Sequence, residues 1–190
     1  MLLVTTHPID DIMQLATARK SKESRLAQRD FTILYTNADG LINKRQELKL
    51  LLNSLKDRPD IVAVTEILPK SPIQQLLPSE FKLEGYKVFF LGLDNKKSRG
   101  ILFYVAMNLE VSVVNIPLAF EECLFLTAKS SSGQKILIGN IYRSPNSLQE
   151  NDNELYELFE YCERNFKMPK VFVGDFNFRN IDWYLSLIHI

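Results

Sequence analysis

The sequence has few of the residues that stabilise disulfide-rich or zinc-binding domains. Its 190 residues include only two cysteines, Cys123 and Cys162, with no metal-ligand spacing between them. Both lie in apolar stretches and are predicted to be small core residues. The sequence therefore indicates no disulfide framework and favours an intracellular setting.

The sequence also lacks net charge and long apolar runs. Lys plus Arg and Asp plus Glu number 23 each, so no overall field attracts nucleic acid, although a local basic groove remains compatible with this balance. Residues 1–4 are too short an apolar stretch for a signal peptide, and no run approaches the length of a membrane span. With 46% hydrophobic and 24% charged residues and no internal repeat, the chain is predicted to form one globular domain.

The first 29 residues are predicted to form a separate arm. Ile9, Ile12, Met13 and Ala16 recur at helical spacing, which predicts a weak helix. Residues 19–29 are rich in charge and amide side chains and are predicted to be a linker. A basic arm touching nucleic acid is the alternative, but the interleaved acidic residues favour a solvated charged segment.

A strand–helix–strand unit opens the domain. Residues 31–36 form an apolar strand pattern, a helix is expected from Lys44, and residues 61–64 form a continuous apolar strand. Asn37 follows the first strand and Glu66 follows the second. Because a right-handed crossover makes such strands parallel, both polar residues are expected at the same edge of the sheet.

The chain then becomes rich in short strands, for which close spacing predicts antiparallel pairing. The expected strands are residues 86–91, 101–105, 111–114, 123–128 and 135–142. The last of these ends at Tyr142 and Arg143. A helix carrying Leu155, Leu158, Phe159, Cys162 and Phe166 at the 3.6-residue period then leads to a buried strand over residues 171–173.

The end of that last strand carries the chemistry on which the functional hypothesis depends. Asp175 and Asn177 stand two residues apart on extended backbone and should point to the same side. One side chain can accept a proton while the other donates a hydrogen bond to the same group. This pairing suits a hydrolytic site for water and phosphate, although a strand ending in an Asx turn gives the same short pattern.

The ordered motifs together are more specific than any one alone. They are Tyr35-Thr-Asn-Ala-Asp-Gly-Leu41, Asp60-Ile-Val-Ala-Val-Thr-Glu66, Ile141-Tyr-Arg-Ser-Pro-Asn-Ser147 and Gly174-Asp-Phe-Asn-Phe-Arg-Asn-Ile-Asp-Trp183. In this order they resemble the endonuclease/exonuclease/phosphatase superfamily, and most narrowly the endonuclease domain of non-LTR (LINE-type) retrotransposons. The resemblance spans residues 31–183.

The resemblance implies a role for each candidate residue. Glu66 would hold Mg²⁺, with Mn²⁺ as the alternative ion, because hard cations prefer carboxylate oxygens and water. Asn37 would orient this carboxylate or a phosphate oxygen, and Tyr142 would bind the phosphate. Asp175 would orient or deprotonate the attacking water or serve the leaving group, while Asn177 would position nucleophile and phosphate. Arg143 would contact the DNA backbone.

The sequence departs from the family in two places. Ser98-Arg99-Gly100 supplies one glycine where many members have several. Residues 184–190 do not match the family, which continues to a second Asp and a terminal Asp-His pair, and His189 is not assigned that role. We therefore expect a four-layer α/β sandwich incomplete at its C-terminus, with one sheet and a single strand of the other, a partly uncovered inner face and poor stability alone.

The predicted domains are an arm at 1–29, a partial endonuclease domain at 30–183 and a tail at 184–190. The predicted function is that of a Mg²⁺-dependent DNA endonuclease fragment from a non-LTR retroelement, inactive as truncated. Its partners would be DNA and a downstream reverse transcriptase domain, not a membrane, and its location nuclear if functional. The alternatives are a phosphatase or phosphodiesterase of the same superfamily and an inactive binding module.

Overall fold

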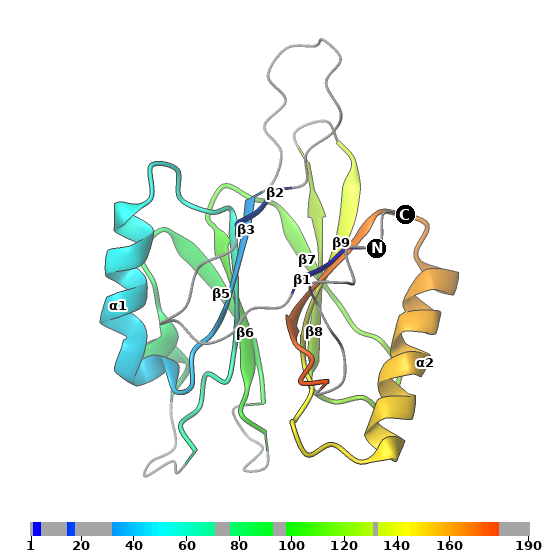
Figure 1. The fold of residues 1–190 in the computed structure, drawn as a ribbon. Helices are drawn as coiled ribbons and strands as arrows, with labels where there is room; N and C mark the ends of the chain where they lie inside the picture. The colour runs from blue at the N-terminus through cyan, green and yellow to red at the C-terminus, as the bar shows by residue number, and fades with distance from the viewer. Residues whose placement is uncertain are drawn as a thin grey trace.

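The computed structural model describes residues 2–4, 15–17, 32–70, 77–92, 98–130 and 133–178. Two five-stranded sheets face each other, with one long helix on the outer side of each (Figure 1). The first sheet has the order β2-β3-β4-β6-β5 and the second has the order β1-β10-β9-β8-β7. The predicted four-layer α/β sandwich is therefore confirmed.

The bounds of the strands from β3 onward agree closely with the sequence pattern. The first sheet consists of β2 (Leu15–Thr17), β3 (Thr32–Asn37), β4 (Ile61–Thr65), β5 (Tyr86–Leu91) and β6 (Ile101–Ala106). The second consists of β1 (Leu2–Val4), β7 (Val111–Val114), β8 (Cys123–Lys129), β9 (Lys135–Tyr142) and β10 (Lys170–Asp175). The helices are α1 (Leu41–Ser54), the 3₁₀ turn η1 (Pro78–Phe81) and α2 (Gln149–Asn165).

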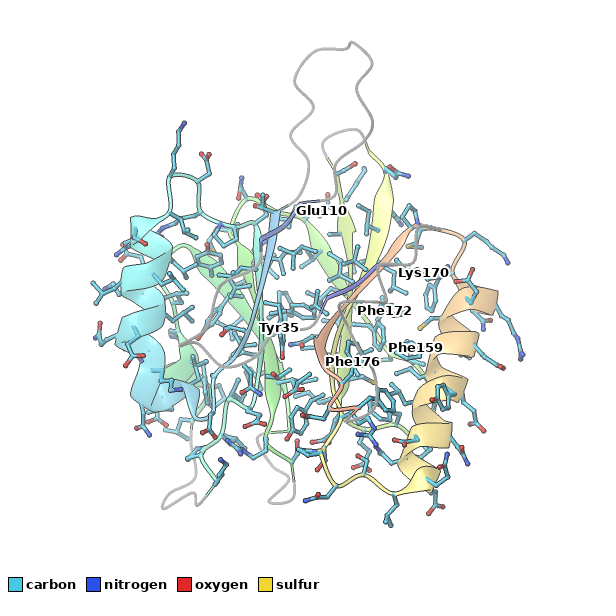
Figure 2. The ribbon with its side chains drawn as sticks, viewed as in Figure 1. Tyr35, Glu110, Phe159, Lys170, Phe172 and Phe176 are labelled. Atoms are coloured by element: carbon cyan, nitrogen blue, oxygen red, sulfur yellow. The ribbon has the colours of Figure 1, made fainter. Side chains whose placement is uncertain are left out.

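Alternation along the strands divides the apolar residues among three cores. Between the sheets, residues such as Ile33, Phe103, Leu126 and Ile138 pack together. The opposite face of the first sheet packs on α1, and the opposite face of the second packs on α2. In the α2 core the Phe159 ring stacks on Phe172 with centroids 5.4 Å apart (Figure 2).

The expectation of one sheet and a single strand of the other is wrong. The chain leaves the first sheet after β6 and enters the second at β7, so that β7, β8, β9 and β10 pair within the second sheet. The inner face is consequently covered: Ile33, Ile101 and Phe103 contact a core that includes Leu124 and Ile138, with Ile136 partly buried against it. Val62 and Val64 face α1 instead.

The opening strand–helix–strand unit is confirmed. Strands β3 and β4 are parallel, with Asn37 opposite Thr65, so Asn37 and Glu66 lie at one edge. Helix α1 begins at Leu41, three residues earlier than expected, after Gly40 in a left-handed conformation (φ 99°). Leu41 donates its N–H to the Ile67 carbonyl, which attaches the helix start to the loop after β4.

The arm differs in part from its prediction. The helical spacing predicts a weak helix at Ala16, but this residue lies in β2 and pairs antiparallel with Ile33 of β3. Ile9, Ile12, Met13 and the predicted linker at 19–29 lie outside the described residues, as does the tail at 184–190. Within the described part of the chain, neither long helix has the length and apolar character to cross a membrane.

A buried amide connects the sheets directly. Asn140 of β9 is fully buried, and its Nδ2 donates to the Val64 carbonyl of β4 at 3.1 Å and to the Leu102 carbonyl of β6 at 2.9 Å. A buried donor without such partners would cost about 1–3 kcal/mol. These two bonds fix the position of β9, which ends at Tyr142, relative to β4, which precedes Glu66, and β6, which follows Arg99.

Candidate active site

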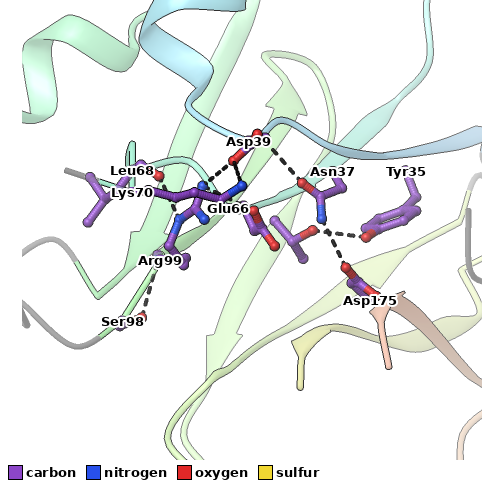
Figure 3. Close-up of polar contacts among 11 residues, drawn as sticks. Tyr35, Asn37, Asp39, Glu66, Leu68, Lys70, Ser98, Arg99 and Asp175 are labelled. Atoms are coloured by element: carbon purple, nitrogen blue, oxygen red, sulfur yellow. Dashed lines mark hydrogen bonds and ion pairs between the residues drawn. The ribbon is translucent and has the colours of Figure 1, made fainter. Parts of the chain in front are cut away.

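Four strand ends meet at one edge of the sandwich. Asn37, Tyr142 and Asp175 are the last residues of β3, β9 and β10, and Glu66 directly follows β4. The Asn37 Nδ2 donates to Asp175 Oδ2 at 2.9 Å, a bond between the two sheets that joins residues 138 positions apart (Figure 3). This pair therefore converges at one edge, as the motifs predicted.

The orientation of the Asn37 amide is fixed from both ends. Its Oδ1 accepts the Asp39 backbone N–H at 3.1 Å, while its Nδ2 donates to Asp175. Beneath it the buried Tyr35 hydroxyl and Thr65 Oγ1 form a hydrogen bond of 2.9 Å. Burial and then the charge of Asp175 raise the Tyr35 pKa well above its usual value, so Tyr35 stays neutral.

Asp175 has the environment of a proton acceptor. Its partial burial raises the pKa of its carboxyl above the ordinary value, and the negative charge of Glu66 raises it further. The amides of Asn37 and Asn177 oppose that shift by stabilising the ionised form. The hydrogen bond from Asn37 also fixes the orientation of the carboxylate at this edge.

Tyr142 is a neutral hydrogen-bond donor. Its side chain is buried and lies near the negative charge of Glu66. Burial raises the Tyr142 pKa, and the nearby charge of Glu66 raises it further, so the hydroxyl keeps its proton at neutral pH. Tyr142 can thus donate a hydrogen bond to an anion at this edge.

Arg143 lies inside the protein rather than at its surface. Its Nε and Nη2 bond to both carboxylate oxygens of Asp152, at 2.6 and 3.0 Å, and its guanidinium stacks 4.3 Å from the Phe178 ring centroid. Its Nη1 donates to the Asn177 carbonyl at 2.9 Å, while the Asn177 Nδ2 donates back to the Arg143 carbonyl at 2.8 Å. A contact from Arg143 to DNA stays a prediction, which this geometry disfavours. The residue instead fixes the loop that carries Asn177.

Backbone strain is concentrated at the same edge. Among the described residues, three non-glycine residues have positive φ: Asp39 (42°), Glu66 (54°) and Asn177 (47°). Asp and Asn tolerate this region, but for Glu it is uncommon and costs free energy. The strain is retained where the chain places polar side chains side by side, which is a pattern typical of functional sites.

Three charged residues that lie beside the site were not predicted from the sequence: Asp39, Arg99 and Glu122. Arg99 contacts Glu66 Oε2 at 3.0 Å and Asp39 Oδ1 at 2.7 Å. Glu122 accepts the Ser98 hydroxyl at 3.2 Å, and burial raises the pKa of its carboxyl. Asp39 lies in the first motif and Arg99 in the Ser98-Arg99-Gly100 segment, so position could have indicated both, whereas nothing in the Glu121-Glu122 pair distinguishes it from a solvated charged turn.

The donor set fits a cation that keeps most of its own water. Glu66 supplies a carboxylate whose side chain is 12% exposed, and Asp175 adds further negative charge at the same edge. In the part of the chain that the structure describes, no group of three or more His, Cys, Asp or Glu side chains could hold a metal ion. Mg²⁺ is commonly bound by one or two carboxylates, water and substrate phosphate, so the residues present fit Mg²⁺ better than Zn²⁺.

Solved structures share this fold at low sequence identity. The endonuclease domain of TRAS1, a telomere-specific non-LTR retrotransposon, matches with a TM-score of 0.55 and 15% identity over 79% of this chain. The AP endonuclease LMAP from Leishmania major gives 0.52 and 13% over 76%. An endonuclease/exonuclease/phosphatase family protein from Bacteroides thetaiotaomicron gives 0.50 and 15% over 73%.

These likenesses identify the fold as that of the endonuclease/exonuclease/phosphatase superfamily, as the motifs predicted. The chain spans 62% of the TRAS1 domain, 54% of the Leishmania enzyme and 56% of the Bacteroides protein. No protein-family model matches the sequence. No curated protein matches it either.

Proposed function

We propose that this edge is the site of a Mg²⁺-dependent phosphodiesterase that nicks DNA, of the kind found in non-LTR retroelements. The observation that carries the proposal is the Asn37–Asp175 hydrogen bond, which brings a fixed carboxylate from the second sheet to the Glu66 edge of the first. The four motifs support the retroelement assignment, and nuclear DNA would be the substrate. A reverse transcriptase domain would belong to the whole protein.

Each side chain has a role that follows from its surroundings. Glu66 would hold Mg²⁺, or Mn²⁺ in its place, and the bound cation would offset negative charge at the phosphate. Asp175 would orient a water molecule and accept its proton, since its raised pKa makes it a better base than an exposed Asp. Tyr142 would donate its hydroxyl to a phosphate oxygen.

The Asn37 amide keeps the Asp175 carboxylate in place from the first sheet. Asn177 lies near the same carboxylate, and both amides favour its ionised form. They would therefore keep Asp175 available as a base, while its burial keeps it reactive. Arg143 and Asp152 would act only through Asn177, by fixing the loop.

The test is nicking of supercoiled plasmid by residues 1–190 in Mg²⁺ or Mn²⁺, with EDTA as the blank; nicking would support the proposal and overturn the expectation that this chain is inactive. Asp175→Asn should lower the nicking rate by roughly 10²–10⁴-fold, the range for loss of a general acid or base. Asp57→Asn is the matched control, since Asp57 is exposed in the loop after α1, and it should leave the rate unchanged.

Two parallel measurements distinguish the alternatives. Hydrolysis of a small phosphomonoester without nicking would replace the proposal with a phosphatase. Metal-dependent DNA binding that is lost in Glu66→Gln, without turnover, would indicate a binding module. Nicking that Asp175→Asn leaves intact would show that another protein or another site is responsible.

A further inference from the structure

Arg99 is fixed beside Glu66 by contacts that do not involve Glu66. Its Nε donates to the Leu68 carbonyl at 2.9 Å, and its Nη2 lies 2.7 Å from Asp39 Oδ1 (Figure 3). Its side chain is only 18% exposed. The guanidinium would therefore keep its place if the Glu66 carboxylate gained another partner.

The backbone fixes the same position. The Leu68 N–H donates to the Arg99 carbonyl at 2.8 Å, and the Ile67 N–H donates to the Gly100 carbonyl at 3.2 Å. Gly100 has φ 66°, and a Cβ there would lie 2.8 Å from Ile67 Cγ1. Only glycine allows the two loops to approach this closely, which places Arg99 against the residues that follow β4.

The Glu66 carboxylate is consequently restrained on one side. Arg99 Nη2 lies 3.0 Å from Oε2, and Arg99 is itself anchored by the Leu68 carbonyl and Asp39 Oδ1. The Glu66 backbone, at φ 54°, limits how the side chain can be re-aimed. A cation that needed both oxygens equally would have to approach the guanidinium, and the two positive charges would repel each other.

This restraint distinguishes between divalent cations. Ca²⁺ takes six to eight oxygen ligands in flexible geometry and often binds both oxygens of one carboxylate. Mg²⁺ prefers octahedral geometry, keeps several waters and is satisfied by a single carboxylate oxygen. A carboxylate with one oxygen already paired to a fixed arginine therefore suits Mg²⁺ or Mn²⁺ and disfavours Ca²⁺.

We propose that Arg99 is a positioning residue that holds Glu66 Oε2 and so makes the site select Mg²⁺ or Mn²⁺ over Ca²⁺. The inference rests on the proposed function, because it takes Glu66 as the metal-binding residue. Asp39 contributes to the same positioning, because its carboxylate, in the loop after β3, contacts the Arg99 guanidinium. Lys70 also reaches Asp39 Oδ1, at 3.5 Å, but its side chain is 74% exposed.

The test measures metal affinity rather than activity. Mn²⁺ binding to residues 1–190 is followed by the loss of the free-ion EPR signal, and Mg²⁺ and Ca²⁺ are measured by competition with Mn²⁺. Arg99→Gln removes both the positive charge and the planar guanidinium, while Arg99→Lys keeps the positive charge and removes the guanidinium. Both should shift the ratio of Ca²⁺ to Mg²⁺ affinity toward Ca²⁺ by about 10-fold, the lower end of effects from partners that orient a ligand.

Lys70→Gln is the matched control, because it removes a positive charge from the same Asp39 and has no contact with Glu66 among the described interactions. It should change both affinities in parallel and leave their ratio alone. If both Arg99 variants, shown by circular dichroism to be folded, keep the wild-type ratio, the inference is wrong even where absolute affinities rise. A ratio shift of equal size in Lys70→Gln would also overturn it.

Failure of the proposed function gives a different result. Wild-type protein would then bind no Mn²⁺, or would bind it equally well after Glu66→Gln. Binding that depends on Glu66 but with a ratio insensitive to Arg99 refutes the selectivity inference alone.

Discussion

Replacing Arg143 by Met should destabilise the protein far more than replacing an exposed arginine. The Arg143–Asp152 pair is bidentate, with exposed side-chain fractions of 8% and 16%. The guanidinium also donates to the Asn177 carbonyl and packs on the Phe178 ring. Met conserves much of the apolar volume, so the main loss is electrostatic.

The magnitude follows from the charge left behind. Removing one partner of a buried ion pair costs about 3–5 kcal/mol, because the other charge stays buried and unpaired. Asp152 retains some exposure and can regain water, which places the expected cost near the lower end, at about 3 kcal/mol. A loss of that size lowers the folding equilibrium constant by roughly 100-fold.

Urea denaturation followed by circular dichroism measures this cost. Arg143→Met, Asp152→Asn and the double variant form a double-mutant cycle, and the double variant should be more stable than the sum of the single losses predicts. Arg164→Met is the control, since Arg164 pairs with Glu160 at 2.7 Å on the same helix but with side chains 74% and 63% exposed. Exposed pairs of this kind contribute about 0.3–0.5 kcal/mol. Equal losses in Arg143→Met and Arg164→Met would refute the reasoning.

Two further predictions concern single hydroxyl and thiol groups. Tyr142→Phe should lower single-turnover nicking by roughly 10- to 100-fold, since a hydrogen bond to a charged group contributes about 1.5–3 kcal/mol, and an unchanged rate would remove Tyr142 from the site. Burial raises the pKa of the Cys162 thiol from 9.0 to about 11, so the thiolate forms first in the unfolded chain. The free energy of unfolding should therefore fall as the pH rises from 9.0 to about 11, and it should fall by more than in Cys162→Ala. Parallel curves of unfolding free energy against pH for the two proteins would show that burial does not raise the pKa of the Cys162 thiol.

The parts of the fold that are local in sequence could be predicted from it. The β3–α1–β4 unit follows from apolar runs separated by one amphipathic segment, and parallel pairing then places Asn37 and Glu66 together. Strand bounds were predictable because apolar patterns with a period of two residues end at turn residues. The sequence could not show that β6 and β7 lie in different sheets, because antiparallel strands have the same alternation in either sheet.

The charged contacts of the site were harder to predict because the local pattern does not identify the partner. Arg99 meets Asp39 across 60 positions, and Arg143 pairs with Asp152, nine positions further on, although its motif suggested a surface loop. An arginine beside a strand end has the same local pattern whether it binds a ligand or an internal carboxylate. Only the packing of α2 against the second sheet brings Asp152 to Arg143.

The Gly-Asp order in the last motif has a structural cause as well as a chemical one. A Cβ at Gly174 would lie 1.8 Å from the Ile141 carbonyl oxygen, so no other residue allows β10 to pair with β9 at this point. That pairing sets Asp175 beside Tyr142 in the second sheet, and the bond from Asn37 then joins both to the first sheet. The residues that position the site are therefore also contacts that align the two sheets. A substitution at Gly174 should disturb chemistry and stability together, whereas Tyr142→Phe, which removes only a hydroxyl, should affect chemistry far more than stability.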